Sequence, residues 1–250
     1  MADAIINNIL EQMQPITLSE MQGVHLMDRV DSKYVAPITI LPELLKATIP
    51  SFKVQITNGK RIASYATQYL DTPALDFFIM HQDGKQNRQK IRIRSYIDSN
   101  ISFLEIKNKN DKGRTRKIRV PVECSHIQTI SDLNANLSFL EKHAILDSHN
   151  LEPVLGTIFD RITLVNHRAT ERVTLDLNLS FINYRTGNEQ KADQLLIVEL
   201  KQDGWQPSDF RDILDRLNIK QVSFSKYCIG TALTDPAVKY DRLKDDTMIV

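Results

Sequence analysis

Residues 88–109 read RQKIRIRSYIDSNISFLEIKNK, a stretch that predicts two β-strands joined by a turn at 98–100. Side chains of a strand alternate between its two faces. One face of the first strand therefore carries a row of cations, and the other carries isoleucines. The second strand repeats the alternation, with Glu105 and Lys107 on one side. Like charges on neighbouring strands repel each other, so an anionic ligand on this face would stabilise it.

Charge is balanced over the whole chain. The 250 residues include 32 lysines and arginines against 31 acids, and the net charge is only +1. A site for anions must then arise from local segregation of charge. With 42% hydrophobic residues the chain can bury a full core. We expect a single domain over 1–250, with an N-terminal helix and lead-in over 1–24 and a C-terminal tail over 234–250.

Several classes of protein are disfavoured. Cys124 and Cys228 lie far apart without a CxxC motif or a histidine partner, which argues against a zinc site or a disulfide. The N-terminus lacks the pattern of a signal peptide, and no run approaches the roughly 20 apolar residues of a membrane helix. We therefore expect a cytoplasmic protein without a transmembrane segment. The aromatic residues are not interleaved with the basic rows as base-stacking platforms would be, so nucleic acid is not an expected partner.

Hydrophobic periodicity and turn residues predict the remaining elements. Helices are expected over 2–14, 41–48, 72–81, 125–143, 207–217 and 223–233. Thr72 is expected to cap the third of these helices, with Pro73 at its first position. Strands are expected over 61–70, 112–122, 154–166, 170–181 and 195–201, together with one that ends before Pro37.

Charged and aliphatic residues alternate on about seven segments, including the pairs Arg29/Lys33, Glu105/Lys107, Lys117/Arg119, Arg172/Asp176 and Glu199/Lys201. An open antiparallel sheet with one wet face would also give this pattern. The charged side is mostly cationic, however, and several amphipathic helices are available to cover the aliphatic side. We therefore predict an α+β fold in which eight antiparallel strands form a closed β-barrel, with a charged tunnel inside and helices outside.

Such a tunnel would select a long, thin and heavily charged ligand. Arginine binds phosphate oxygens in a bidentate manner, and lysine supplies a point charge. The acids Glu105, Asp176 and Glu199 are candidates for binding a hard divalent cation. For Glu105 and Asp176, a structural ion pair is an equal alternative. For Glu199 we favour metal, because it lies in the apolar-flanked segment IVELK and phosphoryl transfer usually requires a divalent ion.

The order and spacing of eight motifs resemble the VTC domain of polyphosphate polymerases, which lies in the CYTH-like superfamily of triphosphate tunnel metalloenzymes. They are DRVDSKY at 28–34, YLDT at 69–72, KIRIRSY at 90–96, FLEIKNK at 103–109, LEPVLGTIFDR at 151–161, RVTLD at 172–176, IVELK at 197–201 and FSKYC at 224–228. The resemblance implies an eight-stranded antiparallel tunnel whose basic lining binds a triphosphate or polyphosphate.

The resemblance also implies roles for single residues. Glu199 would bind Mn²⁺ or Mg²⁺, and the catalytic residues at the transferring phosphate would be Lys226, Arg161 and Arg172. Tyr69 and Asp71 would be architectural. The other phosphate-binding residues would be Arg29, Lys33, Arg92, Arg94, Lys107, Lys201 and Ser225.

One departure from the pattern bears on the reaction. Related tunnel triphosphatases carry ExExK, with two metal-binding glutamates, where this sequence has RVDSK at 29–33. Having fewer acids fits retention of polyphosphate better than activation of water. The leading hypothesis is a polyphosphate polymerase that transfers the γ-phosphate of ATP to a growing polyphosphate chain. The alternatives are a metal-dependent triphosphatase acting on tripolyphosphate or nucleoside triphosphates, and a non-catalytic sensor of polyphosphate or nucleotides.

Overall fold

The computed structural model describes residues 2–21, 29–109, 115–123, 132–133, 136–204 and 206–240. Its helices are α1 (Ala2–Glu11), α2 (Leu18–Met21), α3 (Leu41–Thr48), α4 (Asp76–Gln82), α5 (Leu137–His143), α6 (Asp209–Arg216) and α7 (Lys226–Thr234). Its strands are β1 (Pro15–Thr17), β2 (Arg29–Pro37), β3 (Phe52–Ile56), β4 (Ala63–Asp71), β5 (Arg88–Tyr96), β6 (Ile101–Lys109), β7 (Thr115–Val122), β8 (Glu152–Asn166), β9 (Glu171–Asn183), β10 (Glu189–Ala192) and β11 (Leu195–Asp203).

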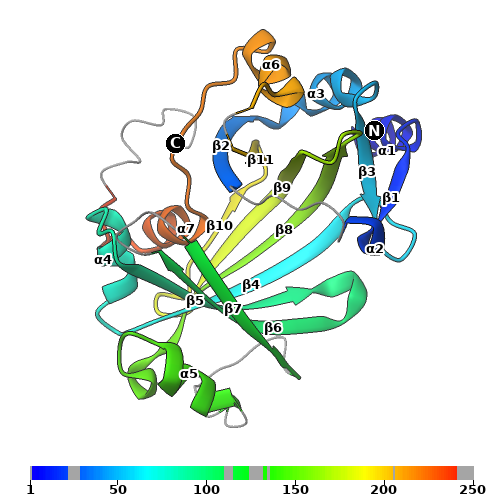
Figure 1. Ribbon diagram of the computed structural model, residues 1–250. Helices are drawn as coiled ribbons and strands as arrows, with labels where there is room; N and C mark the ends of the chain where they lie inside the picture. Colours follow the sequence, from blue (N-terminus) through cyan, green and yellow to red (C-terminus); the bar gives the residue numbers. More distant parts are fainter. Residues whose placement is uncertain are drawn as a thin grey trace.

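All the strands belong to one sheet. Its main path runs β2-β11-β9-β8-β4-β5-β6-β7 (Figure 1), and each neighbouring pair along it is antiparallel. The eight antiparallel strands and the α+β class are therefore as predicted. The short strands β1, β3 and β10, which join the sheet off this path, were not predicted, because they are too brief to show a clear alternation.

The predicted closed barrel is wrong, because the sheet is open. Its end strands β2 and β7 do not pair with each other in the ranges that the structure describes. A physical reason lies at the edge of β2. The segment after α6 covers this edge through a β-bridge from Gln221 to Tyr34 and a hydrogen bond from the Val222 amide to the Lys33 carbonyl, 2.8 Å long. The backbone of β2 at Lys33 and Tyr34, with which β7 would have to pair, is therefore already bonded to the segment after α6.

The open sheet is nevertheless curled (Figure 1). Burial lowers the pKa of Lys107 on β6 to about 8, while the Glu199 carboxylate on β11 raises it and the Lys33 ammonium on β2 lowers it. These strands lie near opposite ends of the sheet's path. Charges from both ends therefore interact across a concave surface. We call this surface the charged face; it carries Lys33, Lys90, Arg92, Arg94, Lys107, Arg161, Arg172 and Glu199.

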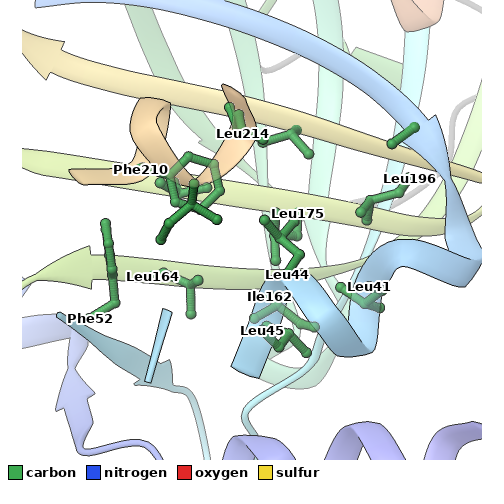
Figure 2. Packing of buried hydrophobic residues seen from close by; sticks show 14 of the residues in the cluster. Leu41, Leu44, Leu45, Phe52, Ile162, Leu164, Leu175, Leu196, Phe210 and Leu214 are labelled. Carbon is green, nitrogen blue, oxygen red and sulfur yellow. The ribbon is translucent and has the colours of Figure 1, made fainter. Parts of the chain in front are cut away.

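The aliphatic residues of the strands pack on the opposite face under helices, as predicted. One cluster lies beneath α1, α3 and α6, where Leu44 and Phe210 contact the sheet residues Leu164, Leu175 and Leu196 (Figure 2). A second cluster joins the isoleucines and leucines of β5 and β6 to α5 and to the segment around Leu151. These two cores hold the sheet in its curled shape, because burial of apolar area is the main favourable term in folding.

A third cluster lies on the charged face itself. Phe159 and Phe181 pack against α7, and Tyr65 stacks on Phe159. Tyr227 of α7 stacks on Tyr69, with ring centroids 5.0 Å apart, and meets Phe78 of α4 edge-on at 6.2 Å. Helix α7 therefore fills the apolar part of the concave side, beside α4 (Figure 1).

Two predicted helices need correction. Helix α4 begins at Asp76 rather than at Pro73, because Asp71 accepts hydrogen bonds from the amides of Phe77 and Phe78, both 2.9 Å long, and so caps the helix later in the chain. Thr72 still contributes, since its hydroxyl accepts a bond from the Asp76 amide.

Of the helix predicted over 125–143, the structure shows only α5, and residues 124–131 and 134–135 lie outside the described ranges.

The other four predicted helices are confirmed as α1, α3, α6 and α7. None of the helices in the described parts of the chain is long and apolar enough to cross a membrane.

Candidate functional site

The four residues at 224–227 are each anchored to a different strand. The Lys33 ammonium on β2 donates to the Phe224 carbonyl at 2.7 Å, and Lys90 on β5 donates to the Ser225 hydroxyl at 2.9 Å. Lys226 pairs with Asp176 on β9, and the Tyr227 hydroxyl donates to Asp71 on β4. The start of α7 is thereby fixed against the charged face.

A cluster of buried charges joins α7 to two neighbouring strands. Arg161 on β8 donates to both oxygens of Asp176, at 2.5 and 2.8 Å, because the two residues are cross-strand partners. Burial raises the pKa of Asp176, but Arg161 and Lys226 together hold it well below its usual value. Burial also lowers the pKa of Lys226 to about 8, which Asp176 partly offsets. The ammonium of Lys226 lies 4.4 Å from the centre of the Phe159 ring.

Glu105 is held by two cations. Arg92 donates to one of its oxygens at 2.9 and 2.8 Å, and Lys117 donates to the other at 2.9 Å. Although Glu105 is buried, the nearby Arg92, Arg94 and Lys117 lower its pKa to about 2. Of the two roles considered from the sequence, metal binding and a structural ion pair, the geometry of both Glu105 and Asp176 fits the ion pair, because their oxygens already face cations.

Glu199 lies in a more open position. Its side chain is 23% exposed, against 1% for Glu105 and 4% for Asp176. Lys201 donates to one of its oxygens at 2.5 Å. Burial raises the pKa of Glu199, but Lys201 and Lys33 hold it well below the usual value, so the carboxylate is ionised at neutral pH.

The environment of Glu199 fits a divalent ion that is shared with phosphate. The register places Glu199 opposite Lys33 and Asp31 opposite Lys201, so the two acids are diagonal neighbours on one face. No group of three or more histidine, cysteine, aspartate or glutamate side chains suited to metal occurs among the described residues. Mg²⁺ commonly uses only one or two carboxylates together with substrate phosphates and water. Glu199, with Asp31 beside it, is sufficient for such a site.

Among the described residues, no carboxylate lies within ion-pair distance of four cations of the charged face, Lys33, Lys90, Arg94 and Lys107. The Arg94 guanidinium has a 3.4 Å hydrogen bond to the Thr67 hydroxyl, and burial together with Arg92 and Arg161 lowers its pKa to about 10. Burial also lowers the pKa of Lys90, to about 7. Partly buried cations that crowd each other in this way favour binding of an anion.

The comparisons with known proteins agree with this geometry. Residues 28–234 match the VTC domain family. The chain belongs to this family.

Three solved structures are similar to this chain. HpAC1 from Hippeastrum, described as an adenylyl cyclase candidate with a dominant triphosphatase activity, has 16% sequence identity and a TM-score of 0.51; the match covers 82% of this chain and 96% of that one. A Bacillus halodurans protein described as an adenylate cyclase candidate has 13% identity and a TM-score of 0.48, with 80% and 96% covered. PH1819 from Pyrococcus horikoshii OT3 has 15% identity and a TM-score of 0.44, with 82% and 98% covered. None of the curated protein sequences compared with the chain matches it.

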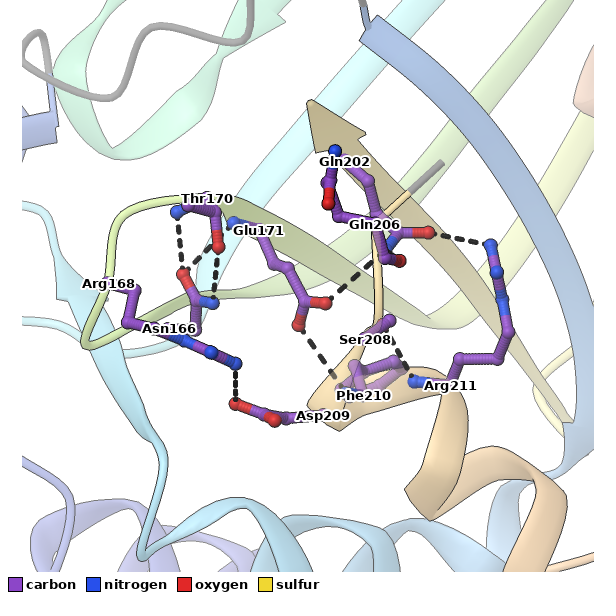
Figure 3. A network of polar contacts seen from close by, with 10 residues as sticks. All are labelled: Asn166, Arg168, Thr170, Glu171, Gln202, Gln206, Ser208, Asp209, Phe210 and Arg211. Atoms are coloured by element: carbon purple, nitrogen blue, oxygen red, sulfur yellow. Dashed lines mark hydrogen bonds and ion pairs between the residues drawn. The ribbon is translucent and has the colours of Figure 1, made fainter. Parts of the chain in front are cut away.

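Two further candidates of this VTC domain, Arg172 and Arg29, lie on β9 and β2. Arg172 is half-buried on β9, with Lys201 as its cross-strand partner. A polar network fixes the start of β9 (Figure 3): the Asn166 side chain accepts from the Glu171 amide, and the Glu171 carboxylate accepts from the Phe210 amide. Arg29 begins β2, but its side chain lies outside the described part.

Sequence reasoning left Lys90 out of the candidate site, although this lysine belongs to the same row as Arg92 and Arg94. It predicted the helix α7 but not its position on the charged face, for which the aromatic Phe159 on the face of Arg161 was a signal. A residue that must pack against a helix would be apolar on an otherwise charged face.

Gly230 lets α7 approach the sheet closely. A Cβ atom at this position would lie 2.3 and 2.7 Å from ring carbons of Phe181 and 2.8 Å from the Leu155 side chain. We expect Gly230→Ala to lower the free energy of unfolding by about 1–3 kcal/mol through overpacking, despite the better helix propensity of alanine, and to weaken substrate binding by moving Lys226. Urea unfolding and substrate titration test this. Adding Phe181→Leu should restore part of the stability and part of the substrate affinity. If Gly230→Ala alone lowered neither, the close packing of α7 on the sheet would be contradicted.

Proposed function

We propose that this VTC domain is a metal-dependent phosphotransferase that transfers the γ-phosphate of ATP to the end of a polyphosphate chain. The observation that carries the proposal is the excess of cations on one concave face, where Arg94, Lys90 and Lys107 have no carboxylate partner within ion-pair distance in the described residues. A phosphate chain would supply the missing negative charge. ATP as the donor also fits the cytoplasmic location expected from the sequence.

The charged face would bind and orient both reactants. Arg94 and Lys107 would hold the phosphate chain, and Arg161 and Lys226 would stabilise the oxygens of the transferring phosphoryl group. A terminal oxygen of the chain attacks the γ-phosphorus, and the bond between this phosphorus and the bridging oxygen of ADP breaks. Such a transfer depends mainly on positioning and electrostatic stabilisation.

Glu199 and Asp31 would hold the divalent ion, Mn²⁺ or Mg²⁺. When bound, this ion would neutralise negative charge that develops during transfer. Asp176 would keep Arg161 and Lys226 together before substrate arrives. Its two ion pairs thus position the cations that the substrate needs.

A second candidate is a triphosphatase, which the shared fold and the dominant activity of HpAC1 favour. Hydrolysis requires a group that orients or activates water. Glu105 and Asp176 already pair with cations, and β2 carries Asp31 where triphosphatases have two glutamates. This arrangement supports transfer to a phosphate chain over transfer to water.

Product analysis distinguishes these functions. Purified protein is incubated with ATP, Mn²⁺ and a short polyphosphate primer, and ADP, orthophosphate and polyphosphate are resolved. The proposal predicts that most of the phosphate lost from ATP appears in lengthened polyphosphate. Equal release of ADP and orthophosphate without chain growth would instead identify a triphosphatase, and tight binding without turnover a sensor.

We expect Arg94→Ala to raise the KM for the polyphosphate primer by at least about tenfold, since a charge-assisted hydrogen bond contributes roughly 1.5–3 kcal/mol. Stability should change little, because Arg94 contacts the described residues only through a weak hydrogen bond to Thr67 and a distant contact with the Tyr65 ring. Initial rates and thermal unfolding check the two expectations. Arg116→Ala is the matched control, because Arg116 is an exposed cation on the other face of β7 and its loss should change neither. Equal effects of the two substitutions would contradict the assignment of Arg94.

A further inference from the structure

The hydroxyl oxygen of Ser225 already accepts two hydrogen bonds. Lys90 donates to it at 2.9 Å from β5, and the Cys228 amide donates to it at 3.3 Å within the cap of α7. A hydroxyl oxygen has two acceptor lone pairs and one proton. Both lone pairs of Ser225 are therefore used, and the proton must point away from Lys90 and from the helix.

The direction of this proton has a consequence for binding. Ser225 lies between Phe224, which Lys33 holds, and Lys226, which pairs with Asp176. Its hydroxyl is thus placed among the cations of the charged face. No described residue accepts a hydrogen bond from the Ser225 hydroxyl, so the proton is available to a phosphate oxygen.

From this arrangement we infer that Lys90 is a positioning residue: as an ammonium it directs the Ser225 hydroxyl proton towards the substrate phosphate, and it thereby couples phosphate binding to the uptake of a proton. The inference rests on the proposed function, because it assigns a role at the same site. Lys90 acts on the phosphate through the Ser225 hydroxyl, which its ammonium form orients, and it takes no part in bond breaking.

The surroundings of Lys90 explain why a proton would be taken up. Burial lowers its pKa to about 7, the Cys228 thiol raises it, and Lys33, Lys107 and Arg92 lower it further. The Nε2 atom of His81 on α4 lies 3.5 Å from the Lys90 ammonium nitrogen. The nearby carboxylate of Asp71 on β4 binds the start of α4 and Tyr227 rather than Lys90. Phosphate would bring negative charge to this cationic pocket and so favour the ammonium form.

The neutral amine would act in the opposite direction. With a lone pair on its nitrogen, Lys90 could accept the Ser225 proton, and the hydroxyl would then have no donor left for phosphate. The free protein loses the ammonium as the pH rises through about 7. Phosphate affinity should therefore weaken as the pH rises from 6 to 8, by about tenfold for a single linked proton.

Calorimetric titration with tripolyphosphate, without metal, tests the inference. Measurements at pH 7.5 in two buffers of different ionisation enthalpy give the number of protons taken up on binding. For a group with a pKa near 7 that becomes fully charged, uptake at this pH is about three quarters of a proton. Lys90→Arg and Lys90→Met should each reduce the uptake by about this amount relative to the unsubstituted protein. The exposed Lys85→Met serves as the control and should not reduce it.

A second comparison separates positioning from direct contact. Lys90→Met should weaken tripolyphosphate binding by about tenfold, but it should cost little in a protein that already carries Ser225→Ala. Undiminished proton uptake in both Lys90 variants would overturn the inference, and so would additive losses of affinity with Ser225→Ala. Either result could occur in a protein that still makes polyphosphate, so the inference and the proposed function can fail separately.

Discussion

Glu199→Gln should lower metal-dependent turnover by about a hundredfold or more, with the fold preserved. Glutamine has the size of glutamate but lacks the charge that a hard cation requires from an oxygen ligand. Lys201 would lose its partner at 2.5 Å, yet Asp31 lies opposite it on β2, so the local charge is not left isolated. Initial rates of ADP release across Mn²⁺ and Mg²⁺ titrations measure the effect.

The exposed acid Glu189 on β10 provides the control for this substitution. Glu189→Gln removes the same charge far from Lys201, and it should leave both the rate and the metal dependence unchanged. If Glu199→Gln kept the original rate and the original half-saturating metal concentration, the metal site would lie elsewhere.

Asp176→Asn should lower the free energy of unfolding by about 3–5 kcal/mol, the usual cost of leaving buried charges without their partner. Arg161 and Lys226 both pair with this carboxylate, whose side chain is only 4% exposed. The folded-state pKa of Asp176 lies below its ordinary value. Its contribution to stability is therefore present above the unfolded pKa and is lost as the pH falls through the folded one.

Substrate should partly reverse the loss at Asp176. Tripolyphosphate supplies negative charge to the same two cations, so it should raise the unfolding temperature more in Asp176→Asn than in the unsubstituted protein. Asp160→Asn is the matched control on β8, because Asp160 accepts hydrogen bonds from Ser64 and Asn178 but pairs with no cation in the described part of the chain. Equal destabilisation by the two substitutions, or an unchanged response to tripolyphosphate, would contradict the role of Asp176.

Strand alternation was a good guide to the charged face. Lys33, Arg94, Lys107 and Arg161 come from four strands, and the parity of each one places it among the cations that the structure brings together. Local sequence determines parity, because successive side chains of a strand point to opposite sides. The helix predicted over 223–233 is likewise present as α7, although it begins at Lys226.

Features that depend on contacts between distant segments were not predictable in the same way. The sheet is open partly because Gln221 and Val222 occupy the edge of β2, and nothing in the pattern of either segment indicates this. The choice between metal binding and ion pairing at Glu105 depended on the register that brings Arg92 and Lys117 to it. Register across several strands is a property of the whole sheet rather than of one stretch.

The most direct measurement is a crystal structure of the protein with tripolyphosphate. We expect the phosphates to lie along the concave side of the sheet, within hydrogen-bonding distance of Arg94, Lys107 and Lys226, with the Ser225 hydroxyl donating to one phosphate oxygen. Phosphates bound on the helix-covered face, or a concave side that stays empty at saturating tripolyphosphate, would contradict the account.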